Sequence, residues 1–149
     1  MRRNVIVMAV SVVAAVLVGA ALQAPSSRDE AVISRAEDGH FWAIGRINGR
    51  PLRMLVDTGA TAVALSREDA ARLGIQVSAS SFSEELVTAG GVRPAARIQL
   101  DSLNVAGAAL TDVEALVVDG PLPAPLLGMS YLGRLSRMEA SPQRLLLEP

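Results

Sequence analysis

The distribution of apolar and polar positions divides the chain into an apolar N-terminal segment, a polar connection and a long region of short apolar runs. The first segment carries no charge from Val5 to Leu22 and follows Arg2 and Arg3. About 18 apolar residues just suffice for a helix to cross a bilayer, and arginines before it favour a cytoplasmic N-terminus. We therefore expect residues 1–24 to be a transmembrane anchor in the inner (cytoplasmic) membrane, with the rest of the chain on its periplasmic or extracytoplasmic side.

Two other interpretations of the apolar segment stay open. A signal peptide cleaved near Val18-Gly19-Ala20 would export the rest of the chain in the same way. A buried core helix is the third interpretation, although the run shows no amphipathic pattern. Residues 25–39 are polar and mixed in charge, which is typical of a juxtamembrane linker, and a short helix over 28–37 is compatible with this composition.

Short apolar runs between turn residues predict one small, mostly β domain over residues 40–149. The pair Asn48-Gly49 separates two such runs and is the strongest local signal of a β hairpin. The second arm of this hairpin, Leu52 to Val56, leads directly into Asp57. Further strands are expected at 62–65, 84–88, 92–100, 103–106, 110–118, 137–140 and 144–147, with a turn at 101–102 and a short helix at 129–135.

Two local patterns refine this outline. Ser66 with Asp69 three residues later resembles a capping box, so a short helix is expected to begin there and to end at Gly74. The glycine-tipped hairpin around Gly90 contains Pro94 in its second arm, and a proline favours an edge or exposed strand position. Such a hairpin is either a mobile flap that projects from the domain or an ordinary surface hairpin.

Composition excludes several classes of chemistry. The chain has 149 residues, a net charge of -1, no cysteine and one histidine, His40. These counts exclude disulfides, thiol nucleophiles, zinc–thiolate sites and multi-histidine metal sites. All 14 basic residues are scattered arginines, so we expect no nucleic-acid partner, and no metal or cofactor is implied.

The strongest candidate for chemistry is Asp57, because an apolar strand delivers this carboxylate into a glycine turn. An acidic side chain beside apolar residues is rarely placed there without a partner or a function. The alternative is an ordinary turn, since Asp, Thr and Gly are all common in turns. The acids without an apolar lead-in are interpreted as solvated, and they are Asp69, Asp101, Asp112 and Asp119.

Three elements carry a resemblance to a known family: Asp57-Thr58-Gly59-Ala60, the Gly90-Gly91 hairpin, and Leu126-Leu127-Gly128 followed by a helix. From about residue 38 to its end, the chain resembles the retroviral-type, or retropepsin-like, aspartic proteases. It looks most like the bacterial members that join one N-terminal transmembrane helix to one such domain. The resemblance implies a small, closed β-barrel-like fold with one or two short helices and aspartic endopeptidase activity on a protein or peptide substrate.

Peptide hydrolysis by carboxylates needs a pair that shares a proton, and the chain offers only one Asp-Thr-Gly. The resemblance therefore implies a homodimer in which the Asp57 side chains of two copies meet at a two-fold axis. It also implies that Leu145 to Leu147 interleave with the partner chain. Asp57 would be catalytic, and the residues implied to bind substrate or shape its site are Thr58, Gly59, Ala60, Ala89, Gly90, Gly91, Leu127 and Gly128.

Two alternative functions lie outside this prediction. A catalytically silent, membrane-tethered domain that binds peptides or serves as a scaffold would keep the same fold, although it would be free to lose Asp57. A hydrolase based on serine or histidine is disfavoured, because His40 is the only histidine and the loop near Ser81 lacks a nucleophile elbow.

Overall fold

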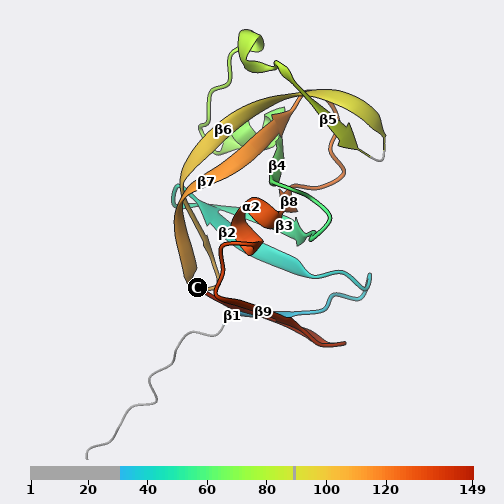
Figure 1. Ribbon diagram of the computed structural model, residues 1–149, viewed down its shortest axis with the longest axis vertical. Coiled ribbons are helices and arrows are strands. Elements are labelled where there is room, and N and C mark those ends of the chain that lie inside the picture. Colours follow the sequence, from blue (N-terminus) through green and yellow to red (C-terminus); the bar gives the residue numbers. More distant parts are fainter. Residues whose placement is uncertain (1–30, 89) are drawn as a thin grey trace, which may run out of the picture.

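The computed structural model describes residues 31–88 and 90–149, which form a mostly β domain with two short α-helices (Figure 1). The predicted anchor and Ala89 lie outside the described residues. In the part of the chain that the structure describes, no helix has the length and apolar character needed to cross a membrane.

The larger sheet has seven strands in the order β2-β3-β8-β4-β7-β6-β5, and a further pairing of β2 with β6 closes six of them into a ring. This closure confirms the barrel-like β architecture expected from the sequence. The strands are β2 (Trp42–Ile47), β3 (Arg50–Val56), β4 (Val63–Ser66), β5 (Glu84–Thr88), β6 (Gly91–Val105), β7 (Ala108–Val118) and β8 (Leu126–Leu127).

A second sheet of three strands lies at one end of the molecule (Figure 1). Its order is β1-β10-β9, with β1 at Ala31–Ser34, β9 at Arg137–Ala140 and β10 at Arg144–Glu148. Leu145 and Leu147 of β10 are buried in the domain core. Both edges of β10 are paired within the chain, so Leu145–Leu147 do not offer the free strand that interleaving with a partner requires.

The structure contains the turn and the helix cap that local sequence patterns predict. Asn48 and Gly49 both have positive φ, at 48° and 82°, and join β2 to β3. The helix α1 (Arg67–Arg72) begins with a complete capping box between Ser66 and Asp69. Asp69 is therefore a buried capping residue, and its interpretation as a solvated side chain is wrong.

Three expectations about element boundaries are also wrong. Residues 31–34 form β1 instead of helix or linker, because β10 supplies a hydrogen-bonding edge and the core accepts Ile33. Asp101–Ser102 does not turn, because β7 pairs with β6 on both sides of it. The helix α2 covers only Met129–Leu132, since the backbone N–H of Gly133 already caps it. The largest fully buried side chains of the core around these elements are Tyr131, Ile47, Met54, Leu65, Leu100, Leu103, Leu127 and Leu147.

Candidate active site

The Asp57 loop begins where β3 ends and is held by hydrogen bonds from backbone N–H groups. The backbone N–H of Asp57 donates to the carbonyl of Leu127 over 3.1 Å, and that of Ala60 donates to the carbonyl of Asp57 over 3.2 Å. Oδ1 of Asp57 accepts from the backbone N–H of Gly59 at 2.8 Å. The carboxylate is half-buried and held by one oxygen, while Oδ2 has no hydrogen-bond partner within residues 31–88 and 90–149.

Gly128 lies directly behind this loop. A Cβ added to Gly128 would lie 2.2 Å from the carbonyl oxygen of Ala62 and 2.8 Å from that of Ala60. The next residue, Met129, donates its backbone N–H to the same Ala60 carbonyl over 2.8 Å. The structure therefore requires glycine at residue 128, because any side chain there would push the Asp57 loop out of position.

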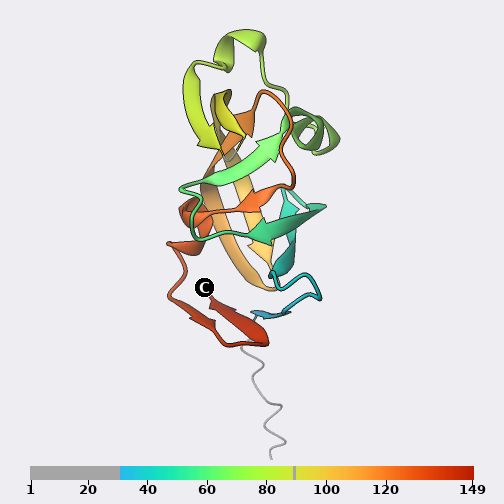
Figure 2. The same cartoon turned by 90° about the vertical axis from the view of Figure 1, so that its right-hand side faces the viewer.

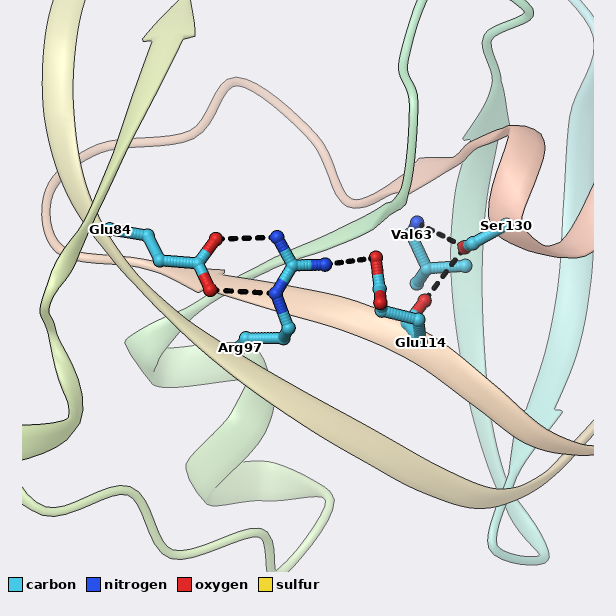
Figure 3. A network of polar contacts seen from close by, with 5 residues as sticks. All are labelled: Val63, Glu84, Arg97, Glu114 and Ser130. Carbon is cyan, nitrogen blue, oxygen red and sulfur yellow. Dashed lines mark hydrogen bonds and ion pairs between the residues drawn. The ribbon is translucent and has the colours of Figure 1, made fainter.

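Ser130 joins three elements around the loop (Figure 3). Its hydroxyl accepts from the backbone N–H of Val63 at 2.9 Å and donates to the carbonyl of Glu114 at 2.7 Å. These two hydrogen bonds connect the start of β4 and the middle of β7 to α2. The role of Ser130 was not predicted from the sequence. The available signal was its position at the start of the predicted helix, directly after Gly128-Met129.

The hairpin of β5 and β6 forms the opposite wall of the site. At its tip, Thr88 Oγ1 donates to the carbonyl of Gly91 at 2.8 Å and accepts from the N–H of Gly90 at 3.2 Å. At its base, Arg97 donates to both carboxylate oxygens of Glu84, each at 2.6 Å, and also pairs with Glu114 (Figure 3). The hydrogen bonds from Arg97 lower the pKa of Glu84 and fasten β5, β6 and β7 together.

A cleft of about 610 Å³ lies between the Asp57 loop and the β5–β6 hairpin. Asp57, Gly59 and Ala60 line it, as the sequence predicts, whereas Thr58 lies outside the lining. Much of the cleft wall is formed by residues that were not predicted from the sequence. These residues are Leu55, Thr61, Ala62, Ala64, Leu86, Val87, Thr88, Leu116, Leu122, Pro123, Ala124 and Leu126.

The other predicted substrate-binding residues stand behind or beside the cleft. Leu127 is fully buried, and its neighbour Leu126 lines the cleft in its place, because successive strand side chains point to opposite faces. Gly128 is buried behind the loop, and Gly90 and Gly91 lie at the hairpin tip outside the lining. In the hairpin, Leu86, Val87 and Thr88 are the residues that reach the cleft.

The cleft is mostly apolar, with two threonines, Thr61 and Thr88, and a single acid. Asp57 is the one acidic residue among the described residues that line it. Within residues 31–88 and 90–149, no three His, Cys, Asp or Glu side chains gather closely enough to hold a metal ion. One carboxylate cannot act as general base and general acid in the same step, so this arrangement supplies one half of an acid–base pair.

A closed β barrel with an Asp-Thr-Gly loop facing a β hairpin across a cleft defines the class of retropepsin-like aspartic proteases. The family model described as "gag-polyprotein putative aspartyl protease" matches residues 43–134. The chain therefore belongs to this retropepsin-like aspartic protease family, as the sequence motifs predict.

Relatives and solved structures agree with this assignment. An uncharacterized protein of Rickettsia prowazekii (strain Madrid E) is 36% identical over 118 residues, which are 79% of this chain and 51% of the relative. An uncharacterized Sinorhizobium protein is 33% identical over 113 residues, 75% of this chain and 48% of the relative. The chain thus spans about half the length of the curated relatives that it matches.

Among solved structures, a retropepsin-like aspartic protease from Rickettsia conorii aligns with a TM-score of 0.71 and 34% identity. That alignment covers 79% of this chain and 89% of the other. The EIAV protease in complex with the inhibitor HBY-793 aligns with a TM-score of 0.51 and 25% identity, over 62% of this chain and 84% of that one.

Proposed function

We propose that this chain is an aspartic endopeptidase that acts as a homodimer, with one Asp57 from each copy forming the catalytic pair. The observation that carries the proposal is the half-buried Asp57 carboxylate, fixed through one oxygen at the wall of a mostly apolar cleft that holds no other acid among the described residues. An isologous dimer places a residue near the two-fold axis opposite its own copy. A second copy thus supplies the acid that a single chain lacks.

In the paired site, two adjacent carboxyl groups share one proton, because both cannot ionise at short distance. The ionised Asp57 removes a proton from water, and the water oxygen attacks the carbonyl carbon of the peptide bond. The protonated Asp57 gives its proton to the carbonyl oxygen. Collapse of the resulting diol breaks the C–N bond, and a proton passes to the leaving nitrogen, so no cofactor is consumed.

The cleft favours an extended peptide with apolar side chains. Leu86 and Val87 approach from the hairpin, while Leu122 and Leu126 approach from the opposite wall. Apolar pockets with few polar groups bind apolar side chains by removing them from water. Closure of the hairpin over such a peptide would exclude bulk water from the Asp57 pair.

Anchoring of this domain in a membrane is part of the proposal and rests on the uncharged run from Val5 to Leu22. A tether raises the local concentration of copies, so a weak dimer in solution would still assemble on the membrane surface. Retention of the full chain in the membrane fraction after alkaline carbonate washing supports the anchor. Release of the intact chain into the supernatant rejects it.

The experiment that tests the activity is a parallel digestion of a peptide library by the full chain and by Asp57→Asn. The matched control is Asp101→Asn, an exposed acid on β6 outside the cleft. We expect cleavage by the wild type and the control, with a loss of at least about 1000-fold in Asp57→Asn, and inhibition by pepstatin. Cleavage that persists unchanged in Asp57→Asn rejects the proposal, and binding of peptides without any cleavage favours the silent-domain alternative.

A further inference from the structure

We propose that two copies join through the free edges of their β9 strands, with β9 of one copy antiparallel to β9 of its partner. The three-stranded sheets of the two copies then become one continuous sheet, and no strand is exchanged. This inference deepens the homodimer of the proposed function and rests on it, since the site in one chain holds a single catalytic carboxylate.

Within the residues that the structure describes, the small sheet has two edge strands, β1 and β9; β1 places Ile33 in the core, whereas no residue of β9 is buried. β10 is paired with β1 on one side and with β9 on the other. All four residues of β9 are exposed, including Met138 with 39% of its surface accessible. An unpaired strand edge carries free N–H and C=O groups that can pair with another chain.

The backbone groups of β9 that face outward can be identified. At the β9–β10 turn, the backbone N–H of Ser141 donates to the carbonyl of Arg144. Because hydrogen-bonded and non-hydrogen-bonded pairs alternate in an antiparallel ladder, Met138 and Ala140 direct their N–H and C=O away from β10. A partner strand therefore has to form its hydrogen-bonded pairs with these two residues.

Charge selects the register. When the two-fold axis passes through Met138, Met138 pairs with its own copy, and Arg137 stands opposite the partner's Glu139. A shift of the partner by two residues in either direction keeps the outward backbone groups matched, but it places Glu139 opposite the partner's Glu139 or Arg137 opposite the partner's Arg137, which like charges disfavour. Opposite charges directly across a strand pair stabilise it, so β9 is complementary to itself in the register centred on Met138.

The position of β9 is compatible with a two-fold axis that also brings the Asp57 loops of the two copies together. In Figure 1 the β5–β6 hairpin, the end of β3 and the β9–β10 hairpin all extend to the same side of the molecule. Figure 2 looks directly onto that side and shows the three elements one above another. A partner that approaches from this side meets the Asp57 loop and the β9 edge together.

Cysteine cross-linking tests this arrangement, because the natural chain contains no cysteine. Met138→Cys in the full, membrane-embedded chain places one thiol at the proposed axis, where paired Cα atoms lie about 5.5 Å apart. Ile44→Cys on β2 is the control, since Ile44 is more exposed than Met138, at 67%. We expect oxidation to yield a covalent dimer with Met138→Cys and none with Ile44→Cys; equal yields from both, or none from Met138→Cys, overturn the proposal.

Charge exchange provides a second, independent test. Arg137→Glu places like charges across the strand pair, and we expect the dimer dissociation constant to rise about tenfold or more. The double variant Arg137→Glu/Glu139→Arg restores opposite charges and should recover dimer affinity and peptide cleavage, whereas Arg144→Glu on β10 should leave both unchanged. Failure of the double variant to recover the dimer overturns the proposal.

The two proposals fail in distinguishable ways. If the wild type cleaves peptides in an Asp57-dependent manner but Met138→Cys does not cross-link, the β9 interface is wrong and the protease assignment stands. If Met138→Cys cross-links but no peptide is cleaved, the interface is supported and the catalytic proposal is wrong.

Discussion

Gly128 and Ala62 are in such close contact that a Cβ on Gly128 would lie 2.2 Å from the Ala62 carbonyl oxygen and 2.6 Å from its carbon. Both of these atoms belong to the backbone, so no side-chain rotation can relieve the overlap. The contact fixes the spacing between β8 and the segment that follows Asp57. The glycine of the Leu126-Leu127-Gly128 element is therefore a packing requirement of the Asp57 loop.

We predict that Gly128→Ala lowers the free energy of unfolding by about 3 kcal/mol or more, because the backbone must move to accommodate the methyl group. Urea denaturation followed by circular dichroism measures this change. Gly90→Ala is the control, since the nearest atom to its added Cβ is Thr88 Oγ1 at 3.8 Å, an ordinary contact. Equal stability of Gly128→Ala and wild type would show that the loop is not packed as described.

Ser130→Ala is expected to lower the free energy of unfolding by about 1–3 kcal/mol, because it leaves the N–H of Val63 without its partner. The substitution also releases the carbonyl of Glu114. Ser83→Ala, at an exposed position on the loop before β5, is the control and should have little effect. If the two variants unfold at the same urea concentration, Ser130 does not contribute as inferred.

The pair of Glu84 and Arg97 predicts a pH dependence. Hydrogen bonds from Arg97 hold the pKa of Glu84 below its ordinary value of 4.5, so the folded state favours the ionised form. This contribution is present above pH 4.5 and is lost as the pH falls through the lowered pKa. NMR titration should show Glu84 of the wild type titrating below 4.5 and Arg97→Gln returning it toward that value.

Glu114→Gln is the matched control for this titration, because it removes the second partner of Arg97 and leaves the two hydrogen bonds to Glu84 in place. The pKa of Glu84 should stay lowered in Glu114→Gln. A Glu84 titration that is identical in wild type and Arg97→Gln would contradict the pairing.

Leu86 contacts the cluster of Ala62, Ala95 and Leu116 from the β5–β6 hairpin and also lines the cleft. We predict that Leu86→Ala raises KM for peptides with a medium-sized apolar side chain and favours peptides with a larger one, because it enlarges the pocket. Val92→Ala is the control, since Val92 is on the same hairpin, 58% exposed and outside the cleft lining. A specificity profile that shifts equally in both variants would assign the effect to the hairpin as a whole.

Structural features that depend on only a few neighbouring residues could be predicted from the sequence. The Asn48-Gly49 turn and the Ser66–Asp69 capping box depend on local backbone conformation and side-chain reach, and the structure has both. The Asp57 loop was identified for the same reason, because its apolar lead-in and glycine are adjacent in sequence.

Features that depend on distant pairing could not be predicted in this way. The residues of β1 are strand because β10 lies beside them, and nothing in their own polar surroundings indicates it. Leu126, not Leu127, faces the cleft, because its orientation is set by pairing of β8 with β3 and β4. Ser130 acquires its role only when α2 is packed between β4 and β7.

The most direct test of the catalytic pair is a mixing experiment in which Asp57→Asn is added to a fixed amount of wild type, above the dimer dissociation constant. If each active site needs Asp57 from two copies, an equal amount of the variant leaves about one quarter of the dimers fully wild type. Total activity should then fall to about half, and a ninefold excess should reduce it to about one tenth. Activity that stays constant at every ratio would contradict the account, because each copy would then hydrolyse peptides without its partner's carboxylate.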